Sequence, residues 1–152
     1  MSENPSLDAG VYPFHHTVRV RFAETDAMGI VHHSRYLPYL EAARVEFLRA
    51  AGHPYDRLRD EGVDLAVVEA WVGYRRPLRF DDLVDVHVRI GSVTKATFQV
   101  AYLLTIAAQE GGTPVVAATA VTVHGAVTRS GAATRLPAWI TKLDAWNLHW
   151  RS

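Results

Sequence analysis

The sequence predicts an α+β protein in which a curved antiparallel five-stranded sheet wraps around one long central helix. Three observations carry this prediction: one strand-like segment, then one long helical segment, then four further strand-like segments. At 152 residues, 49% of them hydrophobic, the chain can bury one continuous core, and a second domain is not expected. We assign residues 1–12 to a flexible N-terminal tail, 13–145 to the single domain and 146–152 to a C-terminal tail.

The first two elements are a strand and the long helix. Apolar and polar residues alternate from Phe14 to Phe22, which is typical of a half-buried strand. Apolar residues then recur at intervals of three and four, so a helix is predicted to begin near Tyr36 or Leu37. Ser34 is its candidate N-cap. Pro38 is acceptable in the first turn, where its missing N–H has no partner to lose.

The remaining elements are a short helix and four strands. Gly52 and Pro54 should end the long helix, and Pro54 to Glu61 has the pattern of a short second one. The later segments alternate apolar and polar residues, and hairpin turns between consecutive segments indicate antiparallel pairing. The four predicted strands are Val63–Tyr74, Leu83–Val93, Ala96–Ala107 and Pro114–Val127.

Two features predict that further apolar surface is buried. Pro137 to Trp146 is predicted as a short closing helix, and Trp139, Trp146 and Trp150 are expected to pack onto the domain. The outer face of the predicted sheet also carries valine, leucine and tyrosine residues that a monomer would expose to water. A homo-oligomer is the simplest way to bury them.

Composition excludes several classes of protein. Lysine plus arginine and aspartate plus glutamate number 16 each, so no net positive field favours nucleic-acid binding. The absence of cysteine excludes disulfides, thiolate metal sites and cysteine nucleophiles, and fits a reducing compartment. No apolar run approaches the ~20 residues that cross a bilayer, and residues 1–10 do not resemble a secretion signal. We therefore expect a soluble, cytoplasmic protein without a membrane span.

Two groups of polar residues are assigned no chemical role. His15 and His16 are neighbours on a strand and point to opposite faces, so they cannot chelate a metal together. No metal site is predicted. Glu41 and Arg44 on the long helix are interpreted as solvated or capping charges.

The segment from Phe22 to Tyr36 carries the strongest chemical signal, because it joins the first strand to the long helix. At such a junction, backbone N–H groups and the positive end of the helix dipole lie beside side chains supplied by a loop. Asp26 in this loop could therefore act on an electrophile whose developing negative charge is held by those N–H groups. Considered alone, an aspartate before a helix is more often a cap or turn residue.

The run from Thr25 to Tyr36, with Glu41 to Arg44 after it, resembles the signature of the 4-hydroxybenzoyl-CoA thioesterase family. A weaker likeness continues through Arg76 to Asp82. This resemblance implies a hotdog fold, the curved sheet around one helix, and active sites between the subunits of a dimer, often within a tetramer. It also implies hydrolysis of acyl-CoA or acyl-carrier-protein thioesters without a cofactor.

The resemblance implies roles for individual residues. Asp26 corresponds to the catalytic carboxylate, acting as nucleophile or as general base, and His33 to the oxyanion donor through its N–H and to a companion side chain. Phe22 and His32 depart from the residues of close relatives, which affects the substrate side of the pocket. The motif residues that we assign to substrate binding are Gly29, Ile30, Val31, His32 and Tyr36.

Arg75 and Arg76 are assigned to the phosphates of CoA, with a merely solubilising charged loop as the alternative. Two alternative functions stay open at this point. One is a non-catalytic hotdog module that binds acyl-CoA. The other is a hotdog dehydratase or hydratase, which is disfavoured because the chain has neither a His-Phe-Pro-Gly nor an Asp-x-Asn-Pro-x-His segment.

Overall fold

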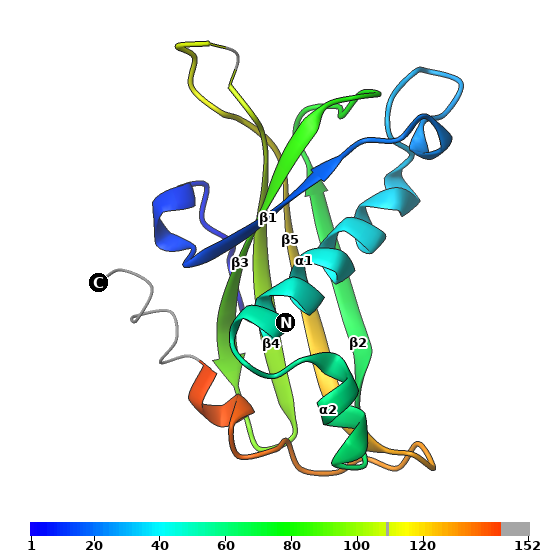
Figure 1. Cartoon of the computed structure of the whole chain (residues 1–152), viewed down its shortest axis with the longest axis vertical. Coiled ribbons are helices and arrows are strands. Elements are labelled where there is room, and N and C mark those ends of the chain that lie inside the picture. Colours follow the sequence, from blue (N-terminus) through cyan, green and yellow to red (C-terminus); the bar gives the residue numbers. More distant parts are fainter. Residues whose placement is uncertain (109, 144–152) are drawn as a thin grey trace.

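A computed structural model describes residues 1–108 and 110–143 of the protein. Its strands are β1 (Phe14–Arg19), β2 (Val63–Tyr74), β3 (Leu83–Val93), β4 (Thr97–Ile106) and β5 (Val115–Thr128). They form one five-stranded sheet in the order β1-β3-β4-β5-β2, with every neighbouring pair antiparallel. The sheet curves around one long helix (Figure 1), which confirms the predicted fold class.

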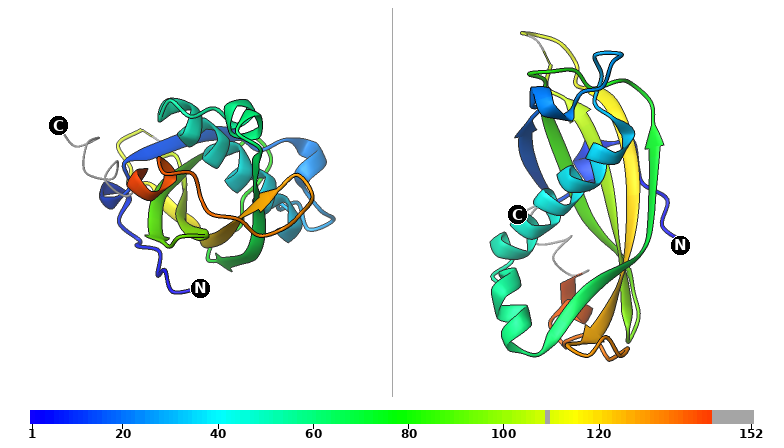
Figure 2. Two further views of the ribbon diagram at one scale, coloured as in Figure 1. Left: turned by 90° about the horizontal axis from the view of Figure 1, so that it is seen from below. Right: turned by 90° about the vertical axis from the view of Figure 1, so that its right-hand side faces the viewer.

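The long helix is α1 (Tyr36–Ala50), and a short helix α2 (Tyr55–Asp60) follows it. Pro38 is the third residue of α1, within the first turn as predicted. The buried residues of α1 recur at helical spacing and form one stripe along it: Tyr36, Tyr39, Leu40, Ala43, Phe47 and Leu48. Helix α1 lies against the concave side of the sheet (Figure 2), and the residues of this stripe belong to one core cluster with strand residues, so α1 supplies one wall of the core.

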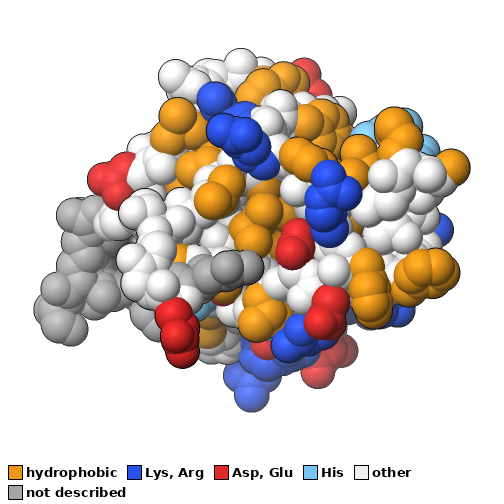
Figure 3. Space-filling model, turned by 90° about the horizontal axis from the view of Figure 1, so that it is seen from above, with side chains coloured by type: hydrophobic (Ala, Val, Ile, Leu, Met, Phe, Trp, Pro, Cys, Tyr) orange, Lys and Arg blue, Asp and Glu red, His pale blue; other side chains and the backbone are white. Residues whose placement is uncertain are grey.

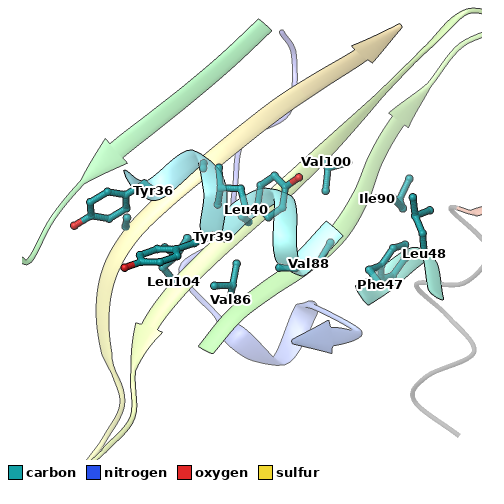
Figure 4. Packing of buried hydrophobic residues seen from close by; sticks show 14 of the residues in the cluster. Tyr36, Tyr39, Leu40, Phe47, Leu48, Val86, Val88, Ile90, Val100 and Leu104 are labelled. Atoms are coloured by element: carbon teal, nitrogen blue, oxygen red, sulfur yellow. The ribbon is translucent and has the colours of Figure 1, made fainter. Parts of the chain in front are cut away.

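The core lies between α1 and the concave face of the sheet (Figure 4). Leu40 and Phe47 point from the helix toward side chains of β3 and β4. Phe47 is 0% exposed and meets Phe14 edge to face, with ring centroids 5.7 Å apart. Full burial of one such side chain stabilises the fold by about 1.5–3 kcal/mol. The strand residues that face the helix include Val86, Val88, Val100 and Leu104.

Two predictions before α1 are wrong. The first strand ends at Arg19 instead of Phe22, and a 3₁₀ helix occupies Phe22–Glu24. The buried Glu24 carboxylate causes this, because its Oε1 accepts the Arg21 backbone N–H at 2.7 Å and closes a turn. Ser34 is not an N-cap: its own N–H donates to the His32 ring nitrogen Nδ1, 3.3 Å away.

The predicted closing helix, Pro137 to Trp146, lies partly outside the described residues. Within them, a 3₁₀ helix spans Ile140–Lys142 and Leu143 is helical, while Trp146 and Trp150 lie outside. Trp139 stacks on His53 with ring centroids 3.8 Å apart and packs against the core. Because His53 follows α1, this contact lies beside the C-terminal end of that helix.

Residues 1–12, expected to be a flexible tail, lie on the outer face of the sheet, opposite α1 (Figure 2). The Ser2 N–H donates to Gln99 Oε1 at 3.0 Å, and Glu3 Oε1 accepts the Ser92 N–H at 2.8 Å. Tyr12 is buried against Ala101 and a neighbouring leucine of β4. The segment therefore covers part of the apolar outer face. Among the described helices, none is long and apolar enough to cross a membrane.

Candidate active site

The loop between β1 and α1 is held by backbone hydrogen bonds at both ends. The His32 N–H donates to the Glu24 carbonyl at 2.9 Å, which ties the end of the loop to its start. The Val31 N–H donates to the Leu78 carbonyl at 2.8 Å, so the segment after β2 supports the loop from its other side. These bonds place a loop of polar side chains at a defined position beside the start of α1.

Asp26 closes a tight turn inside this loop. Its Oδ1 accepts the Met28 N–H at 2.8 Å, and its carbonyl accepts the Gly29 N–H at 2.9 Å. Gly29 has φ = +75°, a left-handed conformation that side chains disfavour. Within the described residues, the second carboxylate oxygen, Oδ2, accepts no hydrogen bond. Asp26 is thus oriented by one oxygen and keeps the other available for a ligand.

A cavity of about 390 Å³ opens at this end of the molecule and contains Asp26. Of the residues assigned to the site from the sequence, the structure also brings Ile30, Val31, His33, Tyr36, Arg75 and Arg76 into its wall. Gly29 and His32 do not line it. Three lining residues were missed by the sequence analysis: Met28, Tyr74 and Pro77.

His33 begins the 3₁₀ helix His33–Arg35, which leads directly into α1. In the described part of the chain, its backbone N–H has no hydrogen-bond acceptor, as is usual for the first N–H groups of a helix. Its carbonyl accepts the Tyr74 hydroxyl at 3.0 Å, which ties the end of β2 to this turn. The His32 side chain instead caps the start of this helix, with its Nδ1 2.8 Å from the Ser34 hydroxyl oxygen.

Two tyrosines, the buried Tyr36 and the half-exposed Tyr74, line the cavity side by side. Tyr36 and Tyr74 meet edge to face with ring centroids 4.8 Å apart. Burial raises the pKa of both hydroxyls above the ordinary value, so each stays a neutral donor near pH 7. The pair joins the first turn of α1 to the last residue of β2.

Arg75 and Arg76 lie at the rim of the cavity, where the chain leaves β2. Their backbone N–H groups both donate to the Ala117 carbonyl, at 2.8 and 3.0 Å, which fixes the position of the turn. Both side chains are exposed, and among the described residues neither makes an ion pair. Figure 3 looks onto this end of the molecule and shows Lys and Arg side chains among hydrophobic ones. Two unpaired guanidinium groups can hold a phosphate at this rim.

The arrangement suits attack on a carbonyl group. A carboxylate with an available oxygen, an unpaired N–H at a helix start and two cations at the rim share one cavity. Within residues 1–108 and 110–143, no group of three or more His, Cys, Asp or Glu could hold a metal ion. The available chemistry is that of a carboxylate, an imidazole and hydrogen-bond donors.

Comparison with known proteins identifies similar chains. A family model described as the thioesterase-like superfamily matches residues 20–143. The chain is 37% identical over 92 residues to an acyl-CoA thioesterase from Haemophilus influenzae. The aligned region is 60% of this chain and 65% of that relative, slightly less than two thirds of its length.

Two solved structures extend the likeness. A hypothetical protein from Aquifex aeolicus has a TM-score of 0.76 and 37% identity, with 86% of this chain and 98% of that chain covered. A 4-hydroxybenzoyl-CoA thioesterase mutant in complex with 4-hydroxybenzoyl-CoA has a TM-score of 0.78 over 86% of this chain and 96% of that chain. At 18% identity, the second likeness concerns the fold alone.

Proposed function

The chain belongs to the thioesterase-like superfamily, and from this premise we propose that it hydrolyses acyl-CoA thioesters with the Asp26 carboxylate as the catalytic group. The family membership confirms the resemblance drawn from the loop motif. The observation that carries the proposal is the cavity that contains both the Asp26 side chain and His33, whose N–H begins a helix. A thioester needs these two functions and no metal, because its thiolate is a good leaving group.

The reaction can follow either of two routes from Asp26. In the nucleophilic route, Oδ2 bonds to the thioester carbonyl carbon, the carbon–sulfur bond breaks, and the CoA thiolate leaves and takes a proton. Water then hydrolyses the acyl–aspartyl anhydride. In the general-base route, the carboxylate accepts a proton from water as the water oxygen bonds to the carbonyl carbon. The carbon–sulfur bond then breaks, and the CoA thiolate leaves and takes this proton from the carboxyl group. Both routes use the oxygen that has no hydrogen bond within the described residues.

Both routes also place negative charge on the thioester oxygen. We assign the His33 N–H as its donor, since this N–H has no partner in the described residues and lies at the positive end of a helix. Loss of one such donor typically costs about 2.7–4 kcal/mol of transition-state stabilisation. The His33 side chain, which also lines the cavity, would orient water or substrate.

At the rim, Arg75 and Arg76 would hold phosphate groups of CoA, while the thioester lies deeper, beside Asp26. The exposed, unpaired state of both side chains supports this assignment. A carrier-protein thioester would place its single phosphate at the same rim. The cytoplasmic location remains part of the proposal, and the absence of cysteine supports it.

The proposal includes a homo-oligomer. The strand β2 is an edge of the sheet, and its exposed residues include Val67, Val68 and Trp71, which are 46–56% exposed. An unpaired edge with large apolar side chains is a surface that a second copy of the chain can cover. Because β2 ends at Tyr74 in the cavity wall, a partner on this edge would lie close to the site. A dimer or tetramer is therefore expected in solution.

The test is release of free thiol from a panel of acyl-CoA thioesters of different chain length and ring content. We expect turnover of at least one member with a kcat well above the rate in buffer. Tight acyl-CoA binding without thiol release from any member would contradict the proposal and would favour a non-catalytic binding module instead.

A further inference from the structure

A second cavity, larger than the active-site cavity, runs beside α1. It has a volume of about 660 Å³, and we call it the helix groove. One wall is α1, and the opposite side is formed by β2 and β5. Its apolar lining is Leu37, Pro38, Leu40, Ala42, Val45, Val67 and Ala70, and its polar lining is His16, Glu41, Arg44, Glu46 and Thr122.

The helix groove adjoins the active-site cavity. Leu37 of the groove follows Tyr36 of the active-site wall on α1. On β2, Ala70 lies four residues before Tyr74, so both side chains face the same side of the strand. Tyr36 and Tyr74 therefore belong to the part of the active-site wall that adjoins the groove along α1 and β2. An acyl chain that reaches from a thioester beside Asp26 into the groove would have to pass this pair.

The floor of the groove carries a buried hydroxyl. Thr122 is 3% exposed, and its Oγ1 lies 3.0 Å from the Tyr102 hydroxyl oxygen and 2.7 Å from His124 Nε2. His124 is fully buried, and its other ring nitrogen, Nδ1, has no hydrogen-bond partner. Burial, and to a smaller extent the charge of Arg44, lowers the pKa of His124 to about 3, so the ring is neutral. A hydroxyl can take part in three hydrogen bonds, so Thr122 has capacity for a ligand.

Arg44 brings a cation to the groove from the α1 side, opposite Thr122. It is half-buried, not solvated as predicted from the sequence, and its charge lowers the pKa of Tyr102 against the larger, raising effect of burial. Arg44 makes no ion pair with any carboxylate of the described residues. A half-buried guanidinium without a carboxylate partner retains donors for a ligand, and these donors are strong because they are charged.

We propose that the helix groove binds an acyl chain of about ten carbons that carries a hydroxyl group near its far end, with Arg44 and Thr122 as its hydrogen-bond partners. This inference rests on the proposed thioester hydrolysis and specifies its substrate. Arg44 lies eight residues after Tyr36, about 12 Å along the helix at ~1.5 Å per residue. An extended chain advances ~1.2 Å per bond, so about ten bonds are needed, more than one aromatic ring supplies.

The charges in the groove select a hydroxyl over a carboxylate at this end. Arg44 can donate to the hydroxyl oxygen, and the Glu41 carboxylate in the same groove can accept its proton. A terminal carboxylate would meet Arg44 favourably but would be repelled by Glu41. The charge of Glu46 is compensated by its ion pair with Arg49. The apolar lining between the tyrosine pair and Arg44 matches the methylene part of the chain.

The experiment compares kcat/KM for decanoyl-CoA and its ω-hydroxy derivative in the full-length protein. We expect the hydroxylated substrate to be preferred by about tenfold or more, the size of one hydrogen bond to a charged group. Arg44→Met and Thr122→Val should each reduce this preference. The matched controls are Arg57→Met, at an exposed arginine of α2, and Thr119→Val, on the opposite face of β5. Both control variants should keep the preference for the hydroxylated substrate.

The outcomes separate this inference from the proposed function. Hydrolysis of both substrates at equal kcat/KM would overturn the helix-groove inference and leave the thioesterase proposal intact. Absence of hydrolysis of both compounds in a protein that hydrolyses another acyl-CoA of the panel would also overturn the helix-groove inference, whereas absence of hydrolysis across the whole panel would contradict the thioesterase proposal. Calorimetric binding of the same two compounds would then test the groove, with equal affinities overturning the inference.

A third outcome concerns a different occupant of the groove. If Arg44→Met changes the oligomeric state in size-exclusion chromatography and slows both substrates equally, a second copy of the chain fills the groove and the inference is wrong. Circular dichroism and thermal unfolding of each variant identify a loss of fold. Thr122→Val, which removes a hydroxyl at nearly constant volume, tests the inference if Arg44→Met does not fold.

Discussion

Acidification should destabilise the protein through His124 well before general acid denaturation. The ordinary pKa of a histidine is 6.5, and burial lowers that of His124 to about 3. Below pH 6.5 the unfolded chain binds a proton at this ring and the folded protein does not, so stability is lost as the pH falls from 6.5 towards 3. At pH 5.5 the loss is about 1.4 kcal/mol relative to neutral pH, and it grows by ~1.4 kcal/mol per pH unit.

The assay is urea unfolding at pH 7.5 and 5.5 at one fixed protein concentration, since oligomers unfold in a concentration-dependent way. The control is His124→Gln, whose amide can keep a hydrogen bond to Thr122 but does not titrate. This variant should lose about 1.4 kcal/mol of the pH effect. The variant should retain the smaller part of the pH dependence that comes from His87, whose pKa is also lowered by burial. Equal pH dependence in the wild type and in His124→Gln would refute the reasoning.

Three further substitutions test the core, the loop and the cavity wall. Phe47→Ala should lower the free energy of unfolding by about 3–5 kcal/mol, because Phe47 is 0% exposed; a loss below ~1 kcal/mol in urea unfolding would contradict the described core. Gly29→Ala should lower kcat and cost about 1 kcal/mol, since φ is +75° and no atom would clash with the added methyl; unchanged kcat would show that the turn does not orient Asp26. Tyr74→Phe removes the hydrogen bond to the His33 carbonyl and should reduce kcat severalfold by steady-state kinetics; an unchanged kcat would exclude this support for the helix start.

Residue patterns predicted the sheet well. Burial alternates in β1 and β3, as expected for strands with one buried face, whereas β4 and β5 are buried along most of their length and were located by their apolar runs and the turns between them. The strands Val63–Tyr74 and Leu83–Val93 begin and end where the alternation indicated. The first strand was overextended because Phe22 continues the alternation, although the Glu24 carboxylate turns the backbone after Arg21. That turn depends on a side-chain-to-backbone hydrogen bond, which periodicity does not report.

The candidate site was predicted where its residues are contiguous in sequence. Asp26 and His33 belong to one loop motif, so both could be named. Tyr74 could not, because only the fold brings the end of β2 against the start of α1. The helical pattern predicted that Arg44 is a solvated charge. In the structure Arg44 is half-buried, because its side of α1 lines the helix groove together with residues of β2 and β5. Site residues that come from strands distant in the sequence can be identified only when the topology of the sheet is known.

The most direct test of the account is the turnover of Asp26→Asn on the best acyl-CoA substrate. The asparagine oxygen can still accept the Met28 N–H, so the loop and the midpoint of thermal unfolding should be preserved. The account predicts a kcat lower by about 10²-fold or more with little change in KM, because the lost interaction acts in the transition state. Turnover near the wild-type rate, in a variant that folds normally, would contradict the role of Asp26 as the catalytic carboxylate.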